Sequence, residues 1–260
     1  MYYFCQEAFI PLRQSPSEAA EMVSQLLFGE FALFLKEKGS WWQVQNLTDQ
    51  YEGWVNAESL LGIEEETFES IVGYRYLFTA NGSLIKPDGT YLRLPLGARL
   101  PLTPDPKRYF QLTLGEHSWI LGPEVVENHR FAGPEAIIEV ARMFLNVPYL
   151  WGGRTSFGID CSGLTQTVFH MCGLKLPRDT SLQIQEGTEV DFDEKQPGDL
   201  AYFSKPNQGR VSHVAIIAPE EKVIHASGRV RVDDFKENGI IQAKTFRQTH
   251  DLITIKRHNV

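Results

Sequence analysis

A cysteine at the start of a predicted helix is the side chain with the clearest capacity for nucleophilic chemistry. Cys161 follows the glycine-rich stretch GGRTSFGID and opens CSGLTQTVFHMCG, in which Leu164, Val168 and Cys172 recur at helical spacing. The positive end of a helix dipole and its N–H groups favour a nucleophilic thiolate and can stabilise an oxyanion. A small buried packing residue is the alternative. Because the chain has three cysteines, at least one thiol stays outside any internal disulfide.

A nucleophilic cysteine needs a base, and two histidines on neighbouring predicted strands could supply one. His213 lies in VSHVAIIA and His225 lies in KVIHAS, 12 residues later, about the length of a hairpin. We therefore expect the two rings side by side, with His213 as the base and His225 as its orienting partner. Ordinary sheet histidines are the alternative. Zinc binding by Cys161 and both histidines lacks CxxC or HExxH spacing, so we expect no metal and no cofactor.

The second half of the chain supplies the elements that would position these residues. The segment GPEAIIEVARMFLN predicts a helix with Pro134 at its first position, and Gly173 predicts the end of the helix that starts at Cys161. The runs GDLAYFS, VSHVAIIA, KVIHAS and LITIKRH predict strands. A helical start followed by strands predicts an α+β domain over residues 131–260.

The first half is predicted to be all β. Residues 1–63 contain short runs rich in aromatic and β-branched side chains, such as FALFLKEK and WWQVQNL, and residues 71–128 repeat this style. We predict two small β-barrels, over residues 1–63 and 64–130. The alternative is one larger β-sandwich over residues 1–128.

Composition excludes several classes of protein. The 260 residues are 42% hydrophobic and 22% charged, with a net charge of −8, which argues against binding to duplex nucleic acid. Residues 1–130 carry 10 basic and 17 acidic side chains, whereas residues 131–260 carry 15 and 16. No apolar run approaches the ~18 residues of a membrane span. We expect a monomer that binds neither nucleic acid nor membrane.

The N-terminal sequence bears on the compartment. MYYFCQEAFIPLRQSP lacks the basic start and apolar run of a secretory leader, so we expect a cytoplasmic protein. If a leader had been removed, a periplasmic or secreted location would follow instead.

Five blocks of the second half resemble the NlpC/P60 family of papain-like cysteine peptidases. They are PYLWGGRTSFGIDCSGL, LPRDTSLQ, QPGDLAYF, SHVAII and VIHAS, in the family's order, within residues 134–258. The resemblance implies that Cys161 is the catalytic cysteine, His213 the catalytic histidine and His225 the third polar residue. It also implies that Tyr149 helps to form the oxyanion site.

The first half adds a second resemblance. Its two predicted β domains resemble bacterial SH3 domains, and this layout is similar to that of γ-D-glutamyl-L-diamino-acid endopeptidases, also called dipeptidyl-peptidase VI. The resemblance implies hydrolysis of the bond between γ-D-Glu and a diamino acid, in murein peptides with a free N-terminal L-Ala, during cell-wall peptide recycling. The alternatives are a secreted hydrolase of intact peptidoglycan and a non-catalytic wall-binding module.

A free substrate ammonium needs a carboxylate partner. Asp160, next to the nucleophile, is our first candidate. The resemblance also implies an acidic side chain and a tyrosine from the first SH3 domain, for which we choose Glu21 and Tyr51, with Glu30 and Glu52 as alternates.

Other polar residues are predicted to line the substrate pocket or to fix its backbone. They are Ser162, Arg178, Asp179, Thr180 and Ser181. A structural ion pair of Arg178 with Asp179 is the alternative for those two.

Overall fold

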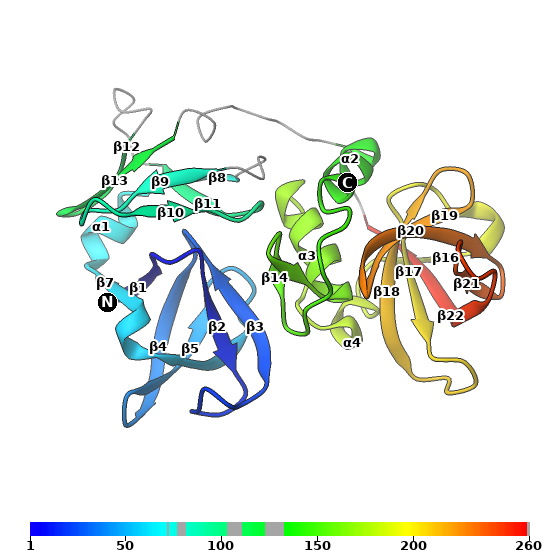
Figure 1. Ribbon diagram of the computed structural model, residues 1–260, viewed down its shortest axis with the longest axis horizontal. Coiled ribbons are helices and arrows are strands. Elements are labelled where there is room, and N and C mark those ends of the chain that lie inside the picture. The colour runs from blue at the N-terminus through cyan, green and yellow to red at the C-terminus, as the bar shows by residue number, and fades with distance from the viewer. Residues whose placement is uncertain (72, 77–81, 103–110, 123–132, 259–260) are drawn as a thin grey trace. The chain divides into compact units, whose positions relative to one another are not determined.

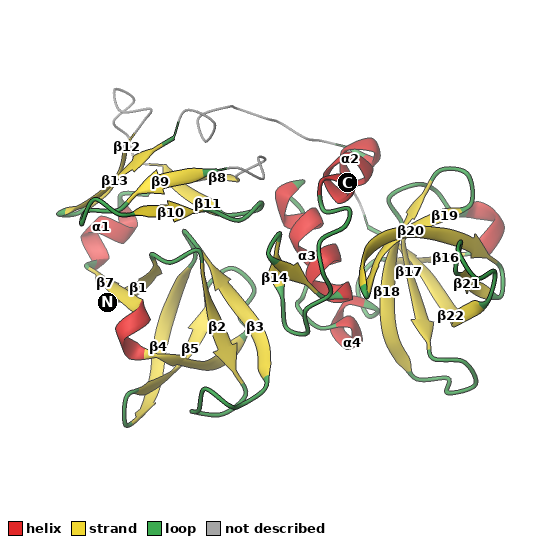
Figure 2. Cartoon of the chain, viewed as in Figure 1, coloured by secondary structure: helices red, strands yellow, loops and turns green. Residues whose placement is uncertain are grey.

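The computed structural model describes residues 1–71, 73–76, 82–102, 111–122 and 133–258 (Figure 1). The chain divides into two compact units, Met1–His129 and Arg130–Val260. Both are mainly β, and the longer helices belong to the second unit (Figure 2). None of the described helices is long and apolar enough to cross a membrane.

The first unit opens with a seven-stranded antiparallel sheet in the order β3-β2-β6-β5-β4-β1-β7. Its strands are β1 (Tyr2–Cys5), β2 (Phe9–Arg13), β3 (Met22–Leu27), β4 (Phe31–Lys38), β5 (Trp41–Asn46), β6 (Glu52–Asn56) and β7 (Leu60–Ile63). Alternate residues point inward, so that Ile10 and Leu12 of β2 are buried with Val55 of β6. The predicted β structure of residues 1–63 is confirmed.

The remainder of the first unit forms smaller sheets. After α1 (Glu65–Glu69), strands β9 (Ser83–Ile85), β10 (Tyr91–Arg93), β12 (Gln111–Leu114) and β13 (His117–Leu121) make one sheet, and β8 (Gly73–Tyr76) pairs with β11 (Arg99–Leu102). Trp119 of β13 is fully buried and packs on Phe4 of β1 and on Phe28. Since both parts of the unit share this core, a second, separate barrel over residues 64–130 stays a prediction.

The second unit begins with helices. They are α2 (Pro134–Met143), α3 (Cys161–Met171) and the short α4 (Thr180–Gln183), and a two-stranded ribbon of β14 (Arg154–Thr155) and β15 (Gly158–Ile159) precedes α3. Pro134 occupies the first turn of α2, and Gly173 lies just beyond α3 with a φ of 82°. The helices predicted from Pro134 and from Cys161 are therefore confirmed.

The strands of the second unit close into a barrel. They are β16 (Thr188–Val190), β17 (Leu200–Ser204), β18 (Val211–Ala218), β19 (Lys222–Ser227), β20 (Arg229–Lys236), β21 (Gly239–Ile241) and β22 (Gln248–Arg257). The order β22-β17-β18-β19-β20-β21 is closed by pairing of β21 with β22, and β16 adds to β22. The predicted combination of helices and strands is confirmed, and the sheet forms a closed barrel.

Both faces of β18 are buried from His213 onward. His213 lies on the same face of β18 as Ala215 and Ile217, which pack inside the barrel, while α2 and α3 also contact this strand. His225 stands two residues from the interior residue Val223. The two histidines therefore lie at one end of the apolar barrel interior.

Candidate active site

Cys161 is the first residue of α3, and its surroundings are set by the residue before it. Asp160 is the N-cap of α3, and its Oδ1 accepts a hydrogen bond of 2.7 Å from the backbone N–H of Gly163. An N-cap aspartate satisfies a helix donor that has no partner within the helix. The cap fixes where the helix starts, and hence where the sulfur lies.

The Asp160 carboxylate also forms a buried ion pair. Arg178 donates from Nη2 to Oδ2 at 2.6 Å and from Nη1 to Oδ1 at 3.0 Å, and the two side chains are only 2% and 6% exposed. Gly152 adds a backbone hydrogen bond of 2.8 Å to Oδ2. Asp160 thus joins the loop before α3, the first turn of α3 and the segment before α4. Because these bonds engage both of its oxygens, binding of a substrate ammonium by Asp160 stays a prediction.

The glycines around Cys161 permit a close backbone approach. A Cβ atom on Gly163 would lie 2.1 Å from the carbonyl oxygen of Gly153, so only glycine fits at this position of α3. The loop of residues 150–158 therefore lies directly against the helix start. This contact explains why the sequence has glycines on both sides of Cys161.

The environment of the sulfur raises its pKa. Cys161 is 6% exposed, and burial, with a contribution from the Asp160 carboxylate, raises the pKa of its thiol to about 11. Hydrogen bonds from the Val214 backbone and from the Thr180 side chain, and the Arg178 charge, act in the opposite direction. Desolvation of the buried sulfur thus opposes the preference for a thiolate that we expect from the helix N-terminus, and it is the larger effect on this pKa.

The structure brings His213 and His225 together. His213 Nε2 lies 2.8 Å from His225 Nδ1, and both side chains are buried. The backbone of Val214, the residue after His213, hydrogen-bonds to the Cys161 sulfur, so the nucleophile candidate contacts the strand that carries the base candidate. Burial and the neighbouring His225 and His250 hold the pKa of His213 well below its usual value, so its imidazole is neutral at pH 7.

The sequence analysis did not identify two charged residues next to His225, the acidic Asp233 and the basic Arg231. Asp233 Oδ2 lies 3.0 Å from His225 Nε2 and accepts a 2.8 Å hydrogen bond from Arg231 Nε. Both partners lie on β20, where Arg231 pairs directly with His225. An acidic and a basic residue alternating on the strand after KVIHAS was the signal that could have identified them.

A third histidine contacts the pair. His250 of β22 stacks on His213 with ring centroids 4.3 Å apart and an interplanar angle of 23°. Burial lowers the pKa of His250 to about 4, so it stacks as a neutral ring. No local spacing groups His250 with His213, because the barrel closure that brings β22 to this end is a long-range pairing.

Tyr149 is placed beside the nucleophile. It lies in the loop before β14, where its backbone N–H donates to Gly228 O at 3.0 Å. Burial and the nearby Cys161 and Asp160 raise the pKa of its hydroxyl well above 10, so that the phenol stays a hydrogen-bond donor. A donor near the sulfur suits an oxyanion site.

The remaining predicted residues fall into two groups. Ser162 is buried and accepts a hydrogen bond of 2.8 Å from Arg178, and Thr180 bonds to the sulfur, whereas Ser181 is exposed on α4. Glu21 and Tyr51 belong to the first unit, so their role toward a substrate stays a prediction.

Glu30 and Glu52, the alternates for the acidic side chain of the first SH3 domain, have other partners in the first unit. Glu30 is 2% exposed, and its Oε2 accepts hydrogen bonds from Leu27 N and Asn46 Nδ2. Glu52 is exposed and accepts one from Gln43.

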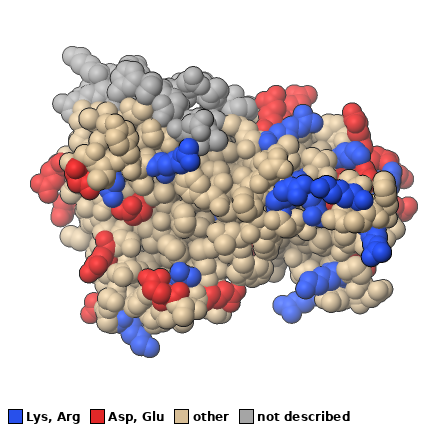
Figure 3. Space-filling view, in the orientation of Figure 1, with Lys and Arg blue, Asp and Glu red and all other residues tan. Residues whose placement is uncertain are grey.

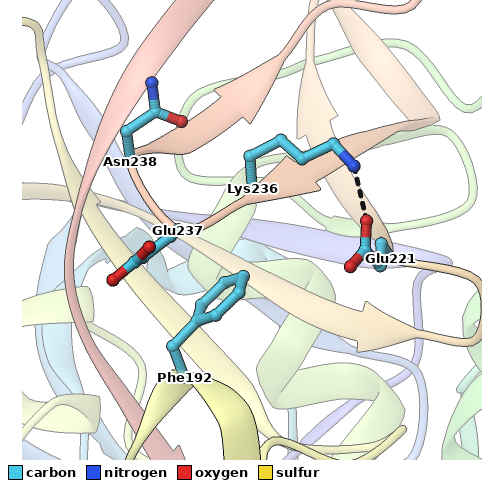
Figure 4. A pocket seen from close by; sticks show the side chains of 5 residues that line it. All are labelled: Phe192, Glu221, Lys236, Glu237 and Asn238. Atoms are coloured by element: carbon cyan, nitrogen blue, oxygen red, sulfur yellow. Dashed lines mark hydrogen bonds and ion pairs between the residues drawn. The ribbon is translucent and has the colours of Figure 1, made fainter.

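A separate hollow on the barrel lacks comparable chemistry. It has a volume of about 490 Å³ and is lined by Phe192, Glu221, Lys236, Glu237 and Asn238 (Figure 4). Its charged side chains are Glu237 and the Lys236–Glu221 ion pair, in which both side chains are 55% exposed. Without a cysteine or histidine in its lining, this hollow offers no nucleophile or base of the kind found at Cys161.

Replacement of Arg178 by Ala should destabilise the second unit by about 3–5 kcal/mol, because it leaves the Asp160 charge buried without its partner. Hydrogen exchange of the α3 amides, converted to opening free energies, measures this loss. Lys236→Ala is the matched control, since it breaks an exposed ion pair and should cost at most about 1 kcal/mol. Equal effects of the two substitutions would contradict the structural role of the buried pair.

Comparison with known proteins agrees with this geometry. Residues 146–249 match the NlpC/P60 family, and residues 12–60 match the bacterial dipeptidyl-peptidase SH3 domain. A γ-D-glutamyl-L-lysine dipeptidyl-peptidase of Bacillus cereus is 28% identical over 228 residues, covering 81% of this chain and 68% of the relative. Dipeptidyl-peptidase 6 of Lysinibacillus sphaericus is 27% identical, covering 83% of this chain and 84% of the relative.

A solved structure supports the fold of the whole chain. An NlpC/P60 family protein from Bacillus cereus superposes with a TM-score of 0.80, at 20% identity, over 99% of both chains. With these matches, the chain contains a bacterial SH3 domain followed by an NlpC/P60 domain, and it is a cysteine peptidase.

Proposed function

We propose that this peptidase hydrolyses the bond between γ-D-Glu and a diamino acid in murein peptides that have a free N-terminal L-Ala, as a step in cell-wall peptide recycling. The observation that carries the chemistry is the position of Cys161, whose sulfur bonds to the backbone next to the buried His213–His225 pair. The substrate class is supported by the relatives named γ-D-glutamyl-L-lysine dipeptidyl-peptidase in Bacillus cereus and Bacillus subtilis.

Acylation starts from an uncharged pair. His213 takes the proton of the Cys161 thiol as the sulfur attacks the γ-carbonyl carbon of D-Glu, so that an S–C bond forms and the carbonyl oxygen becomes an oxyanion. Tyr149 and the backbone N–H groups of the first α3 turn stabilise that oxyanion. The imidazolium of His213 then gives its proton to the leaving nitrogen, and the C–N bond breaks to leave a thioester and a free amine.

Deacylation uses the same base. His213, again neutral, takes a proton from water as the water oxygen attacks the thioester carbon. The C–S bond breaks, the sulfur recovers the proton from His213, and the released product carries the γ-carboxyl group of D-Glu. His225 holds the His213 ring in position through both steps, the role of the third group in catalytic triads.

The substrate carries both signs of charge, and the chain offers groups for each. On the face drawn in Figure 3, Lys and Arg side chains gather on the second unit. Arg229 is exposed and pairs across a β-bridge with Pro148, next to Tyr149, so it is placed to attract a substrate carboxylate. For the ammonium of L-Ala we retain Asp160, Glu21 and Tyr51 as the proposed partners.

Cys161→Ala should abolish hydrolysis of L-Ala-γ-D-Glu-L-Lys, because no nucleophile remains, and chromatography of the released L-Lys measures the loss. Cys172→Ala is the matched control at the other end of α3, and it should keep activity within about threefold. Hydrolysis at the wild-type rate by Cys161→Ala would overturn the assignment of the nucleophile.

The preference for a free N-terminus is tested with the wild-type enzyme. The N-acetylated peptide should be cleaved at least about tenfold less efficiently in kcat/KM, since it removes one charge-assisted hydrogen bond. Equal cleavage of acetylated peptide, or of intact peptidoglycan, would favour a hydrolase of the polymer instead.

The burial of Cys161 and of His213 predicts a specific pH dependence of thiol reactivity. With the pKa of Cys161 at about 11 and that of His213 well below 6.5, the free enzyme holds a neutral thiol and a neutral imidazole at pH 7. Alkylation of Cys161 by iodoacetamide should therefore accelerate by about tenfold per pH unit above neutrality. Labelling of Cys161→Ala corrects for the other two cysteines. A rate that is already constant below pH 7 would instead indicate a preformed thiolate–imidazolium pair.

A further inference from the structure

The hydrogen-bond chain behind Cys161 has a direction, and its last member determines that direction. The chain runs from His213 Nε2 to His225 Nδ1 at 2.8 Å, and from His225 Nε2 to Asp233 Oδ2 at 3.0 Å. Each link needs one donor and one acceptor, and a neutral imidazole has one nitrogen of each kind. Either histidine can exchange its donor and acceptor nitrogens, but the carboxylate of Asp233 can serve only as an acceptor.

Asp233 is held as a charged acceptor. Its Oδ2 accepts from Arg231 Nε at 2.8 Å, its Oδ1 accepts from Ala243 N at 3.1 Å, and its side chain is 4% exposed. Although burial opposes ionisation, the hydrogen bonds from His225, Ala243 and Arg231 lower the pKa of Asp233. An ionised carboxylate can only accept, so His225 Nε2 must donate to it.

The remaining links follow from that one. Burial lowers the pKa of His225 despite the Asp233 charge, so that His225 is neutral at pH 7 and carries its single proton on Nε2. Its Nδ1 must then accept, and His213 Nε2 must donate. A neutral His213 with its proton on Nε2 has an unprotonated Nδ1, which is the only ring nitrogen able to act as a base.

We propose that Asp233 is a positioning residue that sets the tautomers of His225 and His213 and thereby makes Nδ1 of His213 the catalytic base. The proposal rests on the proposed role of His213 as base and adds a fourth member to the Cys161–His213–His225 arrangement. Arg231 acts with it by keeping Asp233 ionised and in place, since its Nη1 is anchored on Ser227 O at 2.8 Å.

The substitution Asp233→Asn removes this constraint with little change in shape. An amide can turn its Nδ2 toward His225, and it would then donate where the carboxylate accepts. His225 Nε2 would become the acceptor, His225 Nδ1 the donor, and His213 would carry its proton on Nδ1. A histidine in that tautomer cannot take the thiol proton, which is the reason that the corresponding substitution in a serine protease triad is so damaging.

Asp234→Asn is the matched control. It makes the same chemical change one residue further along β20, where Asp234 forms an ion pair with Lys222 near the surface. The partner of Asp234 is thus a lysine rather than one of the histidines. The activity of Asp234→Asn should stay within about threefold of wild type.

Two measurements test the proposal. In spectra of ¹⁵N-histidine-labelled enzyme, wild type should show His225 and His213 protonated on Nε2, and Asp233→Asn should shift both toward Nδ1 protonation. In kinetics, Asp233→Asn should lower kcat by at least about 100-fold with KM nearly unchanged, because the tautomer affects proton transfer and not binding.

Several outcomes would overturn the proposal. They are Nδ1-protonated His213 in the wild-type spectrum, or an Asp233→Asn enzyme with tautomers and kcat like those of Asp234→Asn. The wild-type spectrum decides the question even if Asp233→Asn does not fold. A wild-type enzyme that cleaves no γ-D-glutamyl peptide would refute the proposed function, whereas the histidine tautomers would still test the role of Asp233.

Discussion

The buried ion pair between Asp160 and Arg178 is the interaction on which the geometry of the site depends. A carboxylate at this depth is tolerable only because it accepts hydrogen bonds from Arg178, Gly152 and Gly163 at once. These bonds define the first residue of α3 and hold the preceding loop against it. Cys161, the proposed nucleophile, is therefore positioned by the charged residue next to it in the sequence.

The burial of the site also opposes ionisation of Cys161 and of the two histidines. A thiolate at a helix start gains from the dipole and from N–H donors, but removal of water costs more here, as the raised pKa of Cys161 shows. The histidines lie at the end of an apolar barrel and stay neutral for the same reason. In the mechanism that we propose, charges therefore separate only when a substrate carbonyl receives the negative charge, which Tyr149 and the helix N–H groups would stabilise.

Local signals made part of this structure predictable. Pro134 and Gly173 mark helix ends through their own backbone preferences, and a cysteine at a loop-to-helix junction identifies α3 from a few residues. The 12 residues between His213 and His225 fit a hairpin of β18 and β19, which brings the two rings together. Features of this kind depend on residues that are close in the sequence, so they can be predicted from a single sequence.

Features that depend on distant pairings were not predictable. Closure of the barrel requires β21 to pair with β22, and this pairing brings His250 onto His213. The position of Asp233 behind His225 depends on the register of β19 with β20, which no local spacing specifies. The hydrogen-bond partners of Asp160 come from three segments that only the folded structure brings together. The shared core of the first sheet and of the sheets that follow residue 63 is likewise a long-range feature.

The most direct test of the account is to trap the acyl-enzyme. Wild-type enzyme mixed in excess with L-Ala-γ-D-Glu-L-Lys and quenched in acid, which preserves thioesters, should show a transient mass increase equal to one L-Ala-γ-D-Glu acyl group. Peptide mapping should place that group on Cys161, and it should be missing from Cys161→Ala. Product formation without any acylated intermediate, or acylation of a different residue, would contradict the central claim that Cys161 is the nucleophile for this bond.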